Sequence, residues 1–146
     1  MRSKFKTFDA LTNLELYKVL QLRSAVFVVE QNCVYQDIDD VDLQAMHQMI
    51  WENDKPIAYA RILPPGSYFD DLSIGRILTA NSVRGQKIGH LLMRESIAYC
   101  YNHYPKKRIK LSAQQYLIKF YQSHGFEITG KGYLEDGIPH IAMIRY

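Results

Sequence analysis

The chain has 146 residues, of which 47% are hydrophobic and 23% are charged, and its formal net charge is +3. These values are typical of one globular domain, residues 1–146, and the mild charge argues against a nucleic-acid-binding protein. The sequence contains no run of about 18 apolar residues, so it predicts no membrane span, and the N-terminus lacks the apolar stretch of a signal peptide.

The number of cysteines constrains the compartment. Cys33 and Cys100 are the only two, too few for a disulfide framework or a zinc site. We therefore expect a cytoplasmic protein without a metal centre, in which both thiols are inert.

The first predicted elements are a strand and a helix. Phe alternates with Lys and Thr from Lys4 to Phe8, which is typical of a short strand. Thr12 and Glu15 form a capping box, which marks the start of a helix. Apolar residues then recur at helical spacing, so we expect this helix to run to about Gln31.

The rest of the chain predicts strands that two helices interrupt. After an acidic irregular stretch at 32–42, we expect strands at 45–52, 56–63, 72–79, 109–113, 127–131 and 140–146, a long helix at 86–104 and a short helix at 115–123. This order favours an α/β fold with a central mixed sheet of about seven strands, flanked by helices. The last strand is a candidate sheet edge through which a homodimer could form.

The turn before the long helix carries the strongest signal for a ligand. Gly85 and Gly89 flank the predicted helix start. The first N–H groups of a helix have no intrahelical partner, and with the positive end of the helix dipole they favour a phosphate group. Taken alone, this pattern is equally typical of a plain tight turn. The chain lacks both the P-loop pattern and an early Gly-x-Gly-x-x-Gly, so neither of those nucleotide sites is supported.

Further segments extend the pattern over nearly the whole chain. The turn and helix at 75–89, the strand end at 112–115 and the helix end at 120–126 resemble motifs A and B of the GNAT acetyltransferases. Residues 22–31, 37–42 and 135–140 resemble the ElaA-type branch of that family. The resemblance implies the GNAT fold, acetyl-CoA as the cofactor, and a small-molecule or peptide amine as the acetyl acceptor.

The resemblance also implies where acetyl-CoA binds. The family's turn has the form Arg/Gln-x-x-Gly-x-Gly/Ala, and here Arg84 takes the first position and Gly89 the last, but Lys87 replaces the usual glycine. Lys87 keeps its N–H and adds a positive charge, whereas its Cβ crowds the pyrophosphate, so we expect a site with slightly altered geometry. The strand before this turn is expected to splay from its neighbour. The implied cofactor contacts are Ile77, Leu78, Thr79, Arg84, Gly85, Gln86, Lys87, Ile88, Gly89, His90 and Gln114.

Tyr121 is the implied catalytic acid. It occupies the position at which many members of the family have a tyrosine that protonates the departing CoA thiolate. A phenol of pKa near 10 is a better acid than water toward a thiolate of pKa about 8.5 or higher. The alternative is a core tyrosine that packs against Gly125 and Phe126.

No residue is singled out as the base that deprotonates the amine. Arg23 and Glu30 lie on the predicted apolar stripe of the first helix, where charges are rarely buried unless paired. They form an ion pair or anchor the backbone, or else Glu30 faces the acceptor and binds or deprotonates it. His140 is a further catalytic candidate because imidazole titrates near neutral pH, whereas a strand histidine such as His47 is more often structural. An ordered water would need no dedicated base.

Asp37, Asp39, Asp40 and Asp42 form a dense acidic patch after the first helix. Glycine is absent from the sixth position and glutamate from the twelfth, which argues against a calcium loop. The patch is either a solvated loop or a surface that attracts a cationic amine.

The leading hypothesis is therefore an acetyl-CoA-dependent N-acetyltransferase. The main alternative is an acyl-CoA-binding module without turnover, since Lys87 departs from the family pattern and no base stands out. A nucleotide-binding or RNA-associated protein is a third alternative. The residues do not specify the acceptor.

Overall fold

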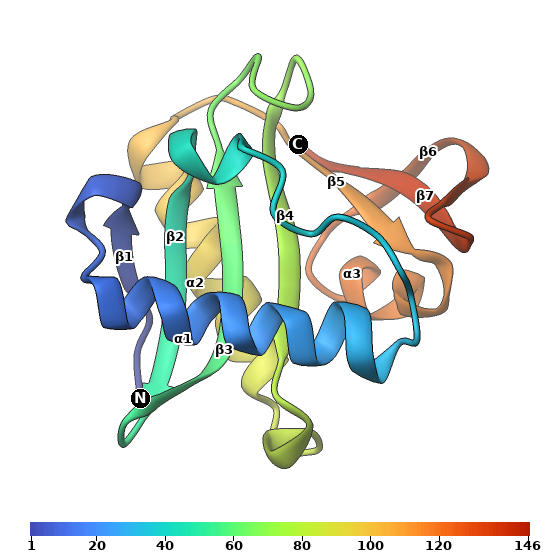
Figure 1. The fold of residues 1–146 in the computed structure, drawn as a ribbon. Helices are drawn as coiled ribbons and strands as arrows, with labels where there is room; N and C mark the ends of the chain where they lie inside the picture. The colour runs from blue at the N-terminus through green and yellow to red at the C-terminus, as the bar shows by residue number, and fades with distance from the viewer.

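A seven-stranded mixed sheet organises the computed structural model, which describes all 146 residues (Figure 1). The strands are β1 (Lys4–Thr7), β2 (Met46–Glu52), β3 (Lys55–Leu63), β4 (Leu72–Thr79), β5 (Ile109–Gln114), β6 (Glu127–Glu135) and β7 (Ile138–Arg145). The helices are α1 (Asn13–Arg23), its π-helical continuation η2 (Ser24–Glu30), α2 (Ile88–His103) and α3 (Ile118–Gln122). The strand order is β1-β2-β3-β4-β5-β7-β6, and only β4 and β5 pair in parallel. The predicted α/β class and strand number are confirmed.

The first helix begins where the capping box predicts. The Oγ1 of Thr12 accepts a hydrogen bond from the Glu15 N–H at 3.0 Å, and the Glu15 carboxylate accepts one from the Thr12 N–H at 2.9 Å. After Arg23 the helix widens into η2, whose residues bond five positions apart, so a 3.6-residue spacing no longer describes which side chains face the sheet. Arg23 is fully buried, whereas Glu30 turns toward the surface, so of the two charged residues only Arg23 lies on the buried stripe.

Helices cover both faces of the sheet (Figure 1). An apolar core on each face holds them in place. The smaller core joins α1 and η2 to the sheet, and it consists of Val19, Val26, Phe27, Met49, Tyr59 and Leu78. The larger core lies on the opposite face, where α2 contributes Leu92, Met93, Ile97 and Cys100. Burial raises the pKa of the Cys100 thiol to about 12, which keeps this thiol protonated and inert at neutral pH. None of the helices is long and apolar enough to cross a bilayer.

The closing hairpin has longer strands and a tighter turn than the sequence predicts. Its turn consists of Asp136 and Gly137, both with positive φ, a pair that is favoured in two-residue hairpin turns. Pro139 lies in β7, beyond the last residue that pairs with β5, so its missing N–H breaks no bond with that strand. β7 is paired on both sides, by β5 and by β6, so the prediction that the last strand is a free edge is wrong. The edges of the sheet are β1 and β6.

Candidate active site

The two parallel strands at the centre of the sheet separate along most of their length. β4 and β5 pair only at Leu72 with Ile109 and at Ser73 with Lys110. A bulge at Arg76, whose φ is 49°, then interrupts the register of β4 against β3. A cavity of about 330 Å³, here called the cofactor cleft, opens beside the diverging strands. Its walls include Ile77, Leu78, Thr79, Gln114, Leu117, Phe120 and Tyr121.

A groove adjoins the cofactor cleft at the start of α2. Gly85 and Lys87 have φ values of 88° and 63°, and α2 begins directly after Lys87 without a side-chain cap. The first N–H groups of this helix therefore remain available, and the groove is lined by the positive side chains of Lys87 and of Arg84, which also pairs with Glu30. Nothing lies within 4 Å of where a Cβ of Gly85 would stand, so the groove has room for a phosphate group.

Nearly all the predicted cofactor contacts are brought together here. The cleft and the groove between them include Ile77, Leu78, Thr79, Arg84, Gly85, Lys87, Ile88, Gly89, His90 and Gln114. Gln86 lines neither the cleft nor the groove. It lies between the two left-handed residues Gly85 and Lys87, in a turn that leaves it exposed to solvent. The unpaired helix start, the two cations and the open strand edge fit a diphosphate with an extended arm.

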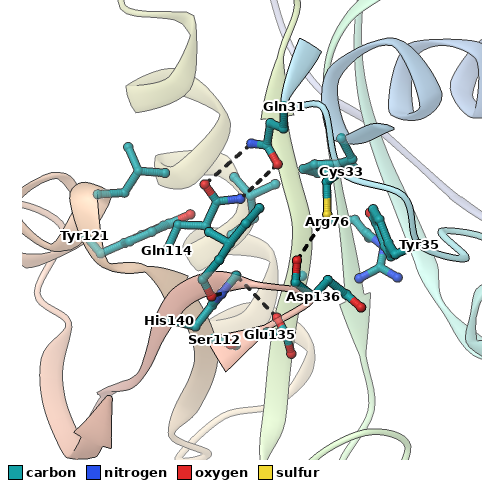
Figure 2. A pocket seen from close by; sticks show the side chains of 15 residues that line it. Gln31, Cys33, Tyr35, Arg76, Ser112, Gln114, Tyr121, Glu135, Asp136 and His140 are labelled. Carbon is teal, nitrogen blue, oxygen red and sulfur yellow. Dashed lines mark hydrogen bonds and ion pairs between the residues drawn. The ribbon is translucent and has the colours of Figure 1, made fainter. Parts of the chain in front are cut away.

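Tyr121 lies in the wall between the cofactor cleft and a second cavity. It is 4% exposed, and its ring contacts Phe120 and Phe126 edge-on. Its hydroxyl has no hydrogen-bonding partner in the chain, and Figure 2 shows it reaching toward Gln114. Burial raises the pKa of Tyr121 above its usual value near 10, so the phenol stays protonated at neutral pH. Tyr121 therefore packs as a core residue and also lies where a catalytic acid would be placed, so its two predicted roles are compatible.

Glu30 and Arg84 form an ion pair on the cofactor side. The Oε2 of Glu30 lies 2.6 Å from the Nη1 of Arg84, and the Nη2 of Arg84 donates to the Thr79 carbonyl at 3.0 Å. Of the alternatives for Arg23 and Glu30, the mutual ion pair is wrong, since Arg23 pairs with Asp37 and Asp42 and Glu30 pairs with Arg84. Glu30 lines the cofactor cleft but not the second cavity, so the structure does not bring it to the position expected for an amine-binding base.

The second cavity, here called the acceptor pocket, is polar and adjoins the cofactor cleft (Figure 2). Gln31 and Gln114 exchange hydrogen bonds of 3.3 and 3.4 Å in the wall that both cavities share. The other residues of the shared wall are Phe27, Ile77, Leu117 and Tyr121. Away from this wall the acceptor pocket is lined by Cys33, Tyr35, Gly75, Arg76, Ser112, Glu135, Asp136, Ile138 and His140. A molecule in the pocket can meet the end of the cofactor cleft beside Tyr121.

The backbone orients His140 in the acceptor pocket. Its Nδ1 lies 2.7 Å from the Ile138 carbonyl, which can only accept, so Nδ1 carries the proton. Nε2 lies 3.3 Å from the Oε2 of Glu135, so this carboxylate would accept a hydrogen bond from a proton on Nε2. His140 is therefore placed to take up a proton at Nε2.

His47 is structural, as predicted. Its Nε2 donates to the Asp42 carbonyl at 2.9 Å, and its Nδ1 accepts from the Tyr59 hydroxyl at 2.6 Å. Burial lowers the pKa of His47 below 6.5, so the ring is neutral in the folded protein.

Three arginines and three aspartates form a cluster of ion pairs, the arginine–aspartate cluster, beside the acceptor pocket. The pairs are Arg23 with Asp37 and Asp42, Arg61 with Asp39 and Asp42, and Arg76 with Asp37 and Asp39, at distances from 2.7 to 3.3 Å. Burial raises the pKa of Asp42, but hydrogen bonds from Arg23 and Arg61 outweigh this effect and hold the value below 3.8.

The cluster corrects the prediction for the acidic patch. Asp37 and Asp42 are buried, Asp39 is half-buried, and all three are neutralised by arginines from α1, β3 and β4. The segment is thus neither a solvated loop nor a surface that attracts an amine, and only Asp40 is exposed as expected.

Splayed parallel strands that lead into an uncapped, cationic helix start define the fold class of the acyl-CoA N-acyltransferases. Solved structures support this class over the full length of the chain. The acyl-CoA N-acyltransferase from Pseudomonas aeruginosa matches with a TM-score of 0.93 at 38% identity, and both chains are covered completely. Escherichia coli ElaA matches with the same TM-score at 44% identity, again with complete coverage of both chains.

The family follows from the sequence comparison. The family model of the acetyltransferase (GNAT) domain matches residues 14–146, and the chain therefore belongs to the GNAT acetyltransferase family. Its sequence is 49% identical to the E. coli protein ElaA over 133 residues, which cover 90% of this chain and 87% of ElaA. The resemblance to the ElaA-type branch is confirmed, and with it the assignment as an acyltransferase that uses CoA thioesters.

Proposed function

We propose that this GNAT enzyme transfers the acetyl group of acetyl-CoA directly to a primary amine. The observation that carries the proposal is the position of Tyr121, a protonated and unpartnered phenol in the wall between the cofactor cleft and a polar pocket. Two cavities that meet at one acid bring two reactants together and supply a proton at the point of contact.

The donor is assigned to the cofactor cleft and the groove. The N–H groups at the start of α2, together with Arg84 and Lys87, hold the diphosphate. Beyond Ser73, β4 has no pairing with β5, so the backbone groups of Ile77–Thr79 on that side are free to bind the amide groups of the pantetheine arm. One such N–H also polarises the thioester carbonyl.

The chain supplies the proton transfers of the reaction. The amine nitrogen bonds to the carbonyl carbon, the carbon–sulfur bond breaks, and the sulfur leaves with the electron pair. Tyr121 gives its hydroxyl proton to this sulfur, and the Nε2 of His140 accepts a proton from the amine. Solvent then restores both groups to their starting state.

Thiol release and thermal stability together test the proposal. CoA at a hundredfold excess over its dissociation constant should stabilise the protein by about 2.7 kcal/mol. Acetyl-CoA with a panel of primary amines should release free thiol. Stabilisation without thiol release from any amine would support a non-catalytic CoA-binding module instead, and stabilisation by ATP or RNA but not by CoA would overturn the assignment of the groove.

Lys87→Gly should weaken CoA binding with little effect on folding. A left-handed backbone costs a non-glycine residue about 1 kcal/mol, but glycine loses more entropy on folding, so the free energy of unfolding changes by less than about 1 kcal/mol. The dissociation constant for CoA should rise about fivefold because a cation leaves the diphosphate groove. Chemical denaturation and titration calorimetry measure the two quantities.

Lys106→Gly is the matched control. Lys106 is also exposed, with a φ of 67°, but it does not line the groove. Its replacement should leave CoA binding unchanged. Equal CoA affinities in the Lys87 variant and the native protein would remove Lys87 from the proposed site.

A further inference from the structure

One end of the acceptor pocket carries negative charge that no lysine or arginine neutralises. Glu135 accepts a hydrogen bond from the Tyr68 hydroxyl at 3.1 Å and lies beside His140, but it forms no ion pair with a lysine or arginine. Asp136, the next residue, is exposed, and its carboxylate makes no ion pair. Both residues line the pocket.

The arginine in this pocket does not offset these carboxylates. Arg76 lies 2.7 Å from Asp37 and 3.3 Å from Asp39. It belongs to the arginine–aspartate cluster, in which three positive and three negative side chains sum to zero. The net charge of the pocket lining is therefore that of Glu135 and Asp136.

The two carboxylates lie at the end of the pocket away from the cofactor cleft. They line the acceptor pocket but not the cofactor cleft, whereas Tyr121 and Gln114 line both, and Glu135 also lines a small neighbouring cavity with Arg61 and Arg76. The tight turn at Asp136–Gly137 fixes the tip of the hairpin, and the Cys33 thiol donates to the Asp136 carbonyl at 3.3 Å. At the opposite end, the side chain of Tyr121 is buried and its hydroxyl has no partner in the chain, so this hydroxyl is free to bond to a ligand in the pocket.

We propose that the acceptor is an aliphatic diamine, whose distal ammonium group binds Glu135 and Asp136 while the other amine reacts beside Tyr121. This inference rests on the proposed function and adds the substrate class. A hydrogen bond between ammonium and carboxylate is about twice as strong as a neutral one, and it forms here in a partly enclosed pocket. A distal carboxylate would face two like charges, and a distal methyl group would gain neither bond.

Three acceptors that differ only at the distal position test the inference. These are 1,4-diaminobutane, butylamine and 4-aminobutanoate, each assayed for thiol release with acetyl-CoA. The kcat/KM for the diamine should exceed that for butylamine about tenfold, and 4-aminobutanoate should be the poorest of the three. The double variant Glu135→Gln, Asp136→Asn should bring the ratio of diamine to butylamine near one. Taking the ratio within each variant cancels any effect that Glu135 has through His140.

Controls separate charge from folding and substrate class from activity. Glu52→Gln, which replaces an exposed carboxylate at the end of β2, should keep the native ratio, and Asp136→Asn alone should lower it partly.

Equal kcat/KM values for the diamine and butylamine in the native protein would overturn the inference and leave the proposed function standing. If none of the three is acetylated, the proposed function fails for this class of amine. Calorimetry of 1,4-diaminobutane with the CoA-saturated protein then decides the inference: binding that the double variant loses supports it, and no binding overturns it.

Discussion

Tyr121→Phe should lower kcat by about a hundredfold to ten-thousandfold, while the dissociation constant for CoA stays nearly unchanged. The substitution removes the proton that we assign to the departing sulfur and keeps the ring that packs against Phe120 and Phe126. The native hydroxyl has no partner in the chain, so its removal breaks no hydrogen bond and should move the melting temperature little. Single-turnover assays, CoA titration and thermal melting measure the three effects.

Tyr116→Phe is the matched control for this experiment. Tyr116 also lines the cofactor cleft, but it is exposed and stands apart from the shared wall. Its loss of a hydroxyl should leave kcat within about twofold of the native value. A Tyr121→Phe enzyme with native kcat would exclude the phenol as the acid and leave it as a core residue only.

Arg23→Met should lower the free energy of unfolding by about 3–5 kcal/mol. Methionine fills much of the same volume, but it leaves Asp42 paired with Arg61 alone and Asp37 with Arg76 alone, so the buried cluster carries one uncompensated negative charge. At about 2–4 °C per kcal/mol for a chain of this size, the melting temperature should fall by about 10 °C. Urea denaturation at neutral pH gives the free energy directly.

At acid pH, the free energies of unfolding of the Arg23→Met variant and the native protein should differ less than at neutral pH. Because the arginines hold the pKa of folded Asp42 below 3.8, their stabilisation is present above that pH and is lost as the pH falls through the folded value. The native and variant curves should therefore converge below about pH 4. Arg108→Met, which removes an exposed pair with Asp71, should have no measurable effect at either pH. A neutral-pH loss of less than about 1 kcal/mol in Arg23→Met would show that water or repacking satisfies the aspartates.

Local signals were sufficient for most of the fold. The capping box at Thr12 and the apolar spacing of α2 predict elements whose hydrogen bonds and buried faces the structure confirms. The side chain of Glu30 was misplaced because the sequence gives no sign that η2 bonds five residues apart, which shifts the phase of the helix. The sequence predicts too short a closing hairpin because proline is disfavoured inside a strand, whereas Pro139 lies where β7 has no partner in β5.

The two halves of the site differ in how far the sequence predicts them. Apart from Gln114, the predicted cofactor residues lie in the continuous segment 77–90 next to a helix start, where a motif and local physical chemistry agree. The acceptor pocket joins the end of η2, the middle of β4 and the tip of the β6–β7 hairpin, which come together only in the folded chain. One signal for the arginine–aspartate cluster was present: Arg61 stands in an otherwise apolar strand and requires a buried partner.

The pairing of β7 with strands on both sides bears on how GNAT enzymes of this kind can vary in sequence. Because β5 and β6 flank it, β7 anchors the hairpin in the sheet, while the turn that carries Asp136 extends past the last rung shared with β5. Substitutions at that turn leave the anchoring ladder and both apolar cores intact. Under the proposed function, substitutions at this turn would change which amine is accepted without changing how the donor is held.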